Sequence, residues 1–144
     1  MKRPIFAVVI GINKYDSPSY DNLRAAAEDA DRFSNYLTQN LAVFRDNIRN
    51  LRDENASRSA ILDSISWLIC HPEIKKNEAA IIIYFAGHGA LINKDIQMIC
   101  PSDIGTELPT CDGHTKIVEG ISGSLLADHF TDLSNAKGSN IVCP

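Results

Sequence analysis

The chain has 144 residues, of which 44% are hydrophobic and 22% charged, a composition typical of folded globular domains that excludes a disordered or fibrous protein. Fourteen Lys and Arg against eighteen Asp and Glu give a net charge of -4, so there is no basic surplus for nucleic acid or an anionic membrane. The longest apolar run, residues 79–86, is too short to cross a bilayer, which takes about 20 residues. We therefore expect one domain over residues 1–144, with neither nucleic acid nor a membrane as its partner.

The four cysteines, Cys70, Cys100, Cys111 and Cys143, have no tight paired spacing, and the N-terminal apolar run lacks the features of a signal peptide. We expect reduced thiols and a cytoplasmic protein, with the nucleus as the alternative. Cys100, Cys111 and His114 could be considered metal ligands, but a structural zinc site needs four ligands with paired spacing. No metal site is expected.

Two segments have the composition of strands that are buried on both faces: IFAVVI at residues 5–10 and AAIIIYF at residues 79–85. Further strands are expected at residues 48–51 and 96–100 and from residue 141, and amphipathic helices at residues 23–37, 61–69 and 125–133. Residues 101–115 are rich in turn formers and are expected to form a long loop. Strands that alternate with helices predict an α/β fold, with a mostly parallel sheet and helices on both faces.

His88 follows the strongest predicted strand and stands between Gly87 and Gly89. In an open α/β sheet, ligands bind beyond the carboxyl ends of the strands, which is where this loop falls. The glycines allow the backbone to approach a ligand closely, and an imidazole exchanges protons near neutral pH. The same pattern also fits a histidine in a glycine turn without a chemical role, so the motif alone does not decide between the two interpretations.

Four blocks of the sequence, in this order, resemble the large-subunit half of the caspase and metacaspase cysteine peptidases. They are FAVVIGINKY (6–15), LRAAAEDAD (23–31), IIIYFAGHGA (81–90) and ICPSD (99–103). The resemblance implies a caspase-like three-layer α/β sandwich, truncated before the strands of the small subunit. It also implies that His88 is the catalytic histidine, that the Gly89 amide helps to form the oxyanion hole, and that Asp29 lines an S1 pocket favouring Arg or Lys at P1.

The nucleophile of this family is a cysteine in a DC(C/S/A)HSG-like segment, at the end of the strand that follows the third helix. This chain reads AKGSNIVCP over residues 136–144 instead. Cys143 stands several positions before the expected nucleophile and precedes a proline, so we do not expect it to be the nucleophile. We expect the chain to carry the histidine half of a Cys-His endopeptidase, incomplete at its C-terminus, with a peptide or protein substrate and a small-subunit or homologous chain as partner.

No cofactor is expected. Metacaspases often bind calcium through a pair of aspartates shortly before this helix, but here GISG at residues 120–123 occupies that region. The alternative function is a catalytically inactive caspase-like fragment that binds or regulates a partner through an exposed sheet edge. Legumain-like, separase-like and bacterial caspase-fold peptidases share the strand followed by His-Gly, but residues 9–13 and 99–103 favour the metacaspase side. A role in apoptosis rests on the resemblance alone.

Overall fold

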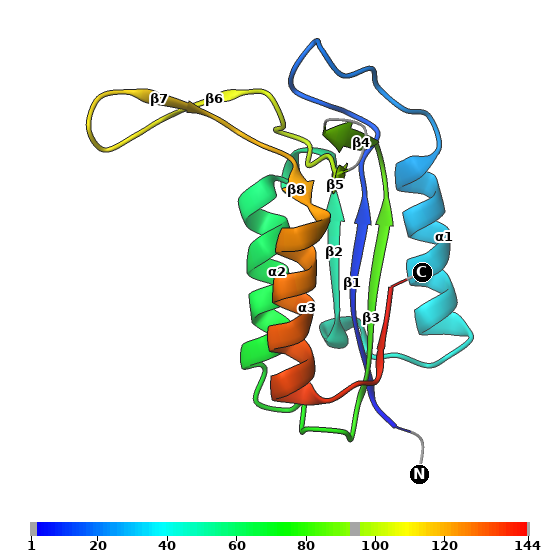
Figure 1. Ribbon diagram of the computed structural model, residues 1–144. Coiled ribbons are helices and arrows are strands. Elements are labelled where there is room, and N and C mark those ends of the chain that lie inside the picture. Colours follow the sequence, from blue (N-terminus) through cyan, green and yellow to red (C-terminus); the bar gives the residue numbers. More distant parts are fainter. Residues whose placement is uncertain (1–2, 93–95, 144) are drawn as a thin grey trace.

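A parallel sheet of four strands forms the centre of the protein, whose computed structural model describes residues 3–92 and 96–143 (Figure 1). The strand order is β2-β1-β3-β9, and each neighbouring pair is parallel. The strands span Ile5–Gly11 (β1), Ile48–Arg52 (β2), Ala80–Ala86 (β3) and Ile141–Val142 (β9). These are four of the five strands that the sequence predicts, and β1 and β3 are the two with the composition of strands buried on both faces.

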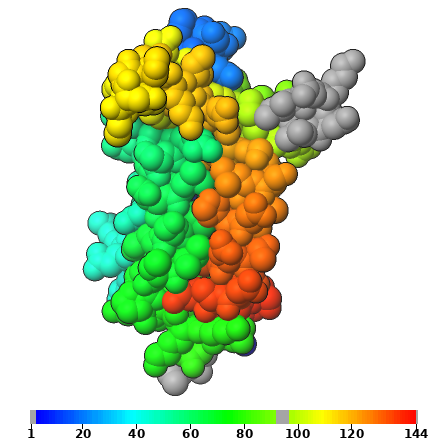
Figure 2. Space-filling model, turned by 60° about the vertical axis from the view of Figure 1, so that its left-hand side comes forward, coloured from blue at the N-terminus to red at the C-terminus, as the bar shows by residue number. Residues whose placement is uncertain are grey.

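Helices cover both faces of this sheet, with α1 (Ala26–Gln39) on one side and α2 (Arg58–Cys70) and α3 (Gly123–Lys137) on the other (Figure 1). Figure 2 shows α2 and α3 side by side on the second face. Short 3-10 helices, η1 (Arg45–Asn47) and η2 (Asp53–Asn55), flank β2. The three layers confirm the expected α/β class and caspase-like sandwich.

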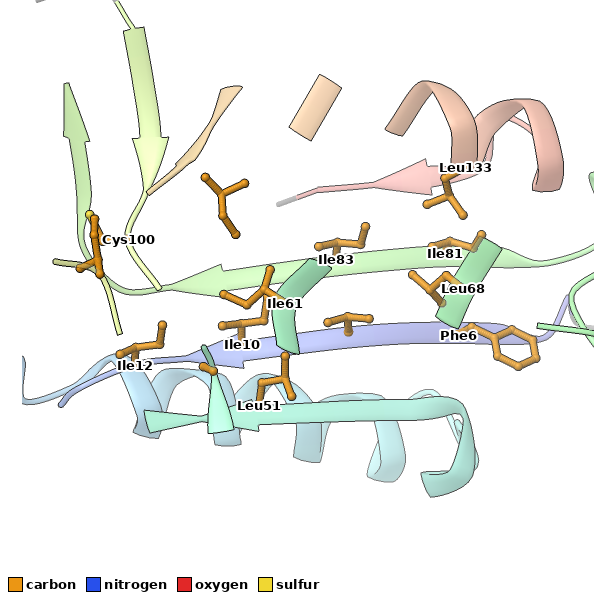
Figure 3. Close-up of a cluster of buried hydrophobic side chains, with 14 of the residues drawn as sticks. Phe6, Ile10, Ile12, Leu51, Ile61, Leu68, Ile81, Ile83, Cys100 and Leu133 are labelled. Atoms are coloured by element: carbon orange, nitrogen blue, oxygen red, sulfur yellow. The ribbon is translucent and has the colours of Figure 1, made fainter. Parts of the chain in front are cut away.

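Strand β1 shows why these segments are apolar throughout. Alternate side chains point to opposite faces of a sheet. Ala7 and Val9 are fully buried with residues of α1, whereas Val8 and Ile10 belong to the core formed with α2 and α3 (Figure 3). Because both faces are covered, neither set of side chains reaches water.

A second, antiparallel sheet lies at the carboxyl end of the parallel one. It has the order β4-β5-β8, with β4 at Gly89–Ile92, β5 at Ile96–Ile99 and β8 at Ile121–Ser122. The sequence predicts the strand at β5 but not β4. This small sheet begins directly after His88, so it fixes the position of the loop that carries the histidine.

The prediction of one long loop over residues 101–115 is wrong in part. Glu107–Pro109 (β6) and Thr115–Ile117 (β7) pair as an antiparallel hairpin that projects from the body of the protein (Figure 1). All six residues of the two strands are exposed. A strand with no buried face carries no apolar alternation, and this is why the hydrophobic pattern does not reveal it.

Candidate active site

His88 lies in the turn between β3 and β4, at the carboxyl edge of the parallel sheet, as the sequence predicts. Its side chain is half-buried, and its Nε2 lies 2.7 Å from the main-chain oxygen of Asp21. A carbonyl oxygen can only accept a hydrogen bond, so Nε2 carries the hydrogen. In the neutral imidazole, Nδ1 is then the free acceptor, which is the form that a general base requires.

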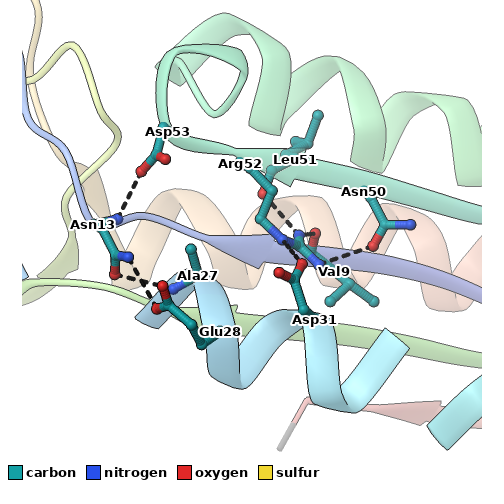
Figure 4. A network of polar contacts seen from close by, with 9 residues as sticks. All are labelled: Val9, Asn13, Ala27, Glu28, Asp31, Asn50, Leu51, Arg52 and Asp53. Carbon is teal, nitrogen blue, oxygen red and sulfur yellow. Dashed lines mark hydrogen bonds and ion pairs between the residues drawn. The ribbon is translucent and has the colours of Figure 1, made fainter. Parts of the chain in front are cut away.

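The carbonyl that holds His88 belongs to the connection between β1 and α1, which a polar network fixes at both of its ends (Figure 4). The Asp53 carboxylate accepts hydrogen bonds from the amides of Asn13, at 2.8 Å, and Lys14, at 2.9 Å. The Asn13 side chain accepts from the Ala27 amide, at 3.0 Å, and so caps the first turn of α1. The Asn13 carbonyl accepts from the Leu23 amide, at 2.7 Å, and closes the loop.

Tyr15, a residue of the same connection, contacts His88 from inside the protein. It is only 8% exposed, and its ring centroid lies 4.9 Å from the imidazole centroid. Its hydroxyl accepts from the His88 amide, at 2.7 Å, and donates to the Cys100 carbonyl, at 3.2 Å. Burial raises the pKa of Tyr15 to about 12, so the hydroxyl stays protonated. No sequence pattern assigns a role to Tyr15 or Asp21, because only the folded loop brings them to His88.

The amide of Gly89 faces away from the small sheet. The Cys100 amide donates to the His88 carbonyl, at 2.9 Å, which makes residues 88 and 100 a hydrogen-bonded position of the ladder. The next pair, Gly89 and Ile99, is therefore a non-hydrogen-bonded position, in which both amides point away from the partner strand. The Gly89 N–H is directed outward, as an oxyanion donor must be.

A largely apolar groove of about 630 Å³ adjoins this loop. It is lined by Gly87 and Gly89 together with side chains from the end of β3, the β4-β5 hairpin and α3, among them Phe85, Leu91, Met98 and Leu126. The groove gives a peptide chain room beside the outward-facing Gly89 amide.

Asp29 lies apart from these contacts. It is exposed in the first turn of α1 and forms an ion pair with Arg32, at 3.4 Å, on the same helix. Among the described residues, it makes no hydrogen bond to the residues around His88. The structure thus brings His88 and Gly89 together and leaves Asp29 on the neighbouring helix surface.

Cys143 is far from His88 along the sheet. Val142 is opposite Ile82, so Cys143 follows at the level of Ile83, five residues before His88. Three of these five steps run along β3 from Ile83 to its end at Ala86, which is about 10 Å at 3.3 Å per residue, and His88 lies beyond that end. Desolvation raises the pKa of the Cys143 thiol, which is the opposite of nucleophile activation.

The residues considered for metal binding do not come together in the described ranges. Cys100 is buried, whereas Cys111 is exposed in the turn between β6 and β7. Within the described ranges, no group of three or more His, Cys, Asp or Glu residues could hold a metal ion. Residues 120–123 contain no carboxylate, and the Ser122 hydroxyl caps α3 through the Leu125 amide, at 3.1 Å, so this segment does not fit calcium. None of the helices in the described parts of the chain has the length and apolar character to span a membrane.

Comparison with known proteins shows the family of the chain. Residues 5–136 match the family described as the caspase domain, Peptidase C14. The fold is similar to the crystal structure of protein GSU0716 from Geobacter sulfurreducens, with a TM-score of 0.57 and 14% identity, over 97% of this chain and 48% of that chain. The chain thus spans about half the length of that structure, and the likeness concerns the fold alone. No curated protein matches the chain. Because the caspase domain match extends over most of its length, the chain belongs to the caspase domain family of peptidases.

Proposed function

We propose that this protein supplies the histidine half of a cysteine endopeptidase of the caspase and metacaspase type. The observation that carries the proposal is the 2.7 Å contact between His88 Nε2 and the Asp21 carbonyl, which leaves Nδ1 as the free acceptor. The family membership supports peptidase chemistry, and the outward-facing Gly89 amide supplies a donor where negative charge would develop.

The reaction is an acyl transfer. His88 Nδ1 takes the proton of a cysteine thiol, and the thiolate attacks the peptide carbonyl carbon, so that a tetrahedral intermediate forms whose oxyanion accepts the Gly89 N–H. His88 then gives its proton to the leaving amine as the C–N bond breaks and a thioester remains. A water molecule, deprotonated by His88, hydrolyses the thioester and restores the thiol.

The substrate proposed is a peptide or protein segment in the groove beside Gly87 and Gly89. Asp29 is proposed to favour Arg or Lys at P1, since an exposed carboxylate attracts a cationic side chain. The nucleophile and the rest of the cleft are proposed to come from a small-subunit or homologous segment beside β3, and the proposed compartment is the cytoplasm.

A catalytically inactive binding module is the second candidate, and the position of Cys143 favours it. Within the described residues, β9 pairs with β3 only at Ile81 and Ile82, so the edge of β3 from Ile83 to Ala86 has no partner strand. An extended segment of another caspase-like chain could add to that edge by backbone hydrogen bonds.

Fluorogenic peptides with Arg, Lys or Asp at P1 separate the two candidates. They are incubated with the 144-residue chain and with the complete product of its gene, in wild-type, His88→Ala and His114→Ala forms. His114 is an exposed hairpin histidine and is the matched control. We expect the complete product to cleave, with His88→Ala lowering the rate by at least about 100-fold and His114→Ala leaving it unchanged. Equal cleavage by His88→Ala, or no cleavage by the complete product both alone and with a homologous caspase-like chain added, would refute the enzyme proposal and favour the binding module.

A further inference from the structure

The hydroxyl of Tyr15 lies at the end of the β4-β5 ladder, at the pair that follows Gly89 and Ile99. At a hydrogen-bonded position of an antiparallel pair, two residues exchange both of their backbone hydrogen bonds. At the position of His88 and Cys100, only the bond from the Cys100 amide to the His88 carbonyl is direct, at 2.9 Å. The second bond runs through Tyr15, whose hydroxyl accepts from the His88 amide, at 2.7 Å, and donates to the Cys100 carbonyl, at 3.2 Å.

The chain around this hydroxyl is built to admit it. A Cβ atom on Gly87 would lie 2.9 Å from both the Tyr15 hydroxyl oxygen and the Phe85 Cζ, so a larger residue there would displace these side chains. Tyr15 itself comes from the β1-α1 connection, whose amide at Tyr15 donates to the Asn22 side chain, at 3.0 Å. The same short connection therefore presents the Tyr15 hydroxyl to the His88 backbone and the Asp21 carbonyl to the His88 imidazole.

The Tyr15 ring also limits the movement of the imidazole. The two ring centroids are 4.9 Å apart, with the planes inclined at 49°. The imidazole thus has a tilted contact with a buried ring, while Nε2 is held by the Asp21 carbonyl at 2.7 Å. Backbone, ring plane and one ring nitrogen of His88 are all fixed by residues of one loop.

We propose that Tyr15 is a positioning residue for His88: its hydroxyl keeps the β4-β5 ladder from closing directly on His88, and its ring holds the imidazole so that Nε2 stays on the Asp21 carbonyl. The catalytic meaning of this arrangement rests on the proposed function, whereas the arrangement itself can be tested without any activity. Removing the hydroxyl leaves the His88 amide and the Cys100 carbonyl to meet each other, which draws His88 toward β5 and away from Asp21.

The test compares Tyr15→Phe with the matched control Tyr20→Phe in the 144-residue chain. The Tyr20 ring packs near Tyr15, at a centroid distance of 6.1 Å, but its hydroxyl is not part of the ladder. The readout is the NMR signal of the His88 Nε2 proton in water, which is seen only while a hydrogen bond protects that proton from exchange. We expect Tyr15→Phe to abolish this signal or to speed its exchange by at least about tenfold, and Tyr20→Phe to keep it.

A folded Tyr15→Phe variant that keeps the protected Nε2 proton would overturn the proposal, because a purely structural tyrosine would lower stability and leave this signal in place. If Tyr15→Phe does not fold, the test is made on the wild-type protein. The Tyr15 hydroxyl proton must then show a nuclear Overhauser effect to the His88 amide proton, and the absence of this effect overturns the proposal.

In the complete gene product, Tyr15→Phe is expected to lower kcat about 10-fold to 100-fold with KM nearly unchanged, since a displaced base affects the chemical step. Failure of the proposed function alone would give a different result. The His88 Nε2 proton would still be protected in a way that depends on Tyr15, but the protein would show no cleavage that depends on His88.

Discussion

Replacement of Gly11 by alanine should damage the contact between β1 and α1. Gly11 is the last residue of β1, and a Cβ atom there would lie 2.5 Å from the Ala30 Cβ, 2.8 Å from the Ala26 carbonyl oxygen and 3.0 Å from the Ala27 Cα. Carbon atoms in contact normally lie about 3.5–4.0 Å apart, so the start of α1 must move by about 1 Å. The obstructing atoms belong to a helix backbone and a fully buried side chain, which have no rotamer with which to yield. We expect a loss of about 2–3 kcal/mol in the free energy of unfolding, the upper part of the usual range for overpacking.

Urea denaturation followed by circular dichroism measures this loss, with Gly123→Ala as the matched control. A Cβ on Gly123 would meet the Gln97 carbonyl oxygen at 3.5 Å, an ordinary contact, and Gly123 is the first residue of α3. The control should be neutral or stabilise the protein by up to about 1 kcal/mol. A Gly11→Ala protein within about 0.5 kcal/mol of wild type would refute the reasoning, since that is the effect of an average surface substitution.

Three further predictions concern the candidate site. The pKa of Tyr15 is about 12 in the folded protein and 10.0 in an unfolded chain, so the unfolded state loses this proton first as the pH rises. The free energy of unfolding that is present below pH 10 is therefore partly lost as the pH rises toward 12. Between about pH 9 and pH 11, the free energy of unfolding measured with urea should fall by about 1 kcal/mol more in wild type than in Tyr15→Phe. An equal fall in the two proteins would contradict this prediction. Asp53→Ala should lower the free energy of unfolding by about 1–3 kcal/mol, because the Asn13 and Lys14 amides lose their acceptor. Asp53→Asn keeps an acceptor and should lower it by less in the same assay. Cys143→Ser should leave the rate of peptide cleavage by the complete gene product within about twofold of wild type. A loss as large as that of His88→Ala would instead indicate that Cys143 is the nucleophile.

The parallel sheet and its helices are predictable from sequence because their signal is strong and local. Residues 5–10 and 79–85 are apolar on both faces, and the covering layers of helix that this requires are the ones observed. The position of His88 follows from the same pattern, because a residue just after a buried parallel strand must lie at the carboxyl edge of the sheet.

The remaining parts depend on contacts that no local pattern encodes. The β6-β7 strands bury no side chain and so leave no periodic signal. Tyr15 looks like any aromatic residue after a strand, and its role emerges only when Gly87 and Cys100 come within reach of its hydroxyl. Asp21 acts through its main-chain oxygen, for which the identity of the side chain gives no clue.

The register of the sheet also restricts where a nucleophile can act. Val142 is opposite Ile82, four residues before the end of β3 at Ala86, which is about 13 Å at the rise of a parallel strand, and His88 lies beyond that end. A thiol delivered to Nδ1 of His88 by a strand that lies beside β3 must therefore come from the level of Gly87 and His88, beyond the edge that Ile83–Ala86 presents. Tyr15 and the Asp21 carbonyl already hold the imidazole without that strand. The imidazole of His88 is thus held in place before any partner is added, and under the proposed function only the position of the thiol would depend on what pairs with β3.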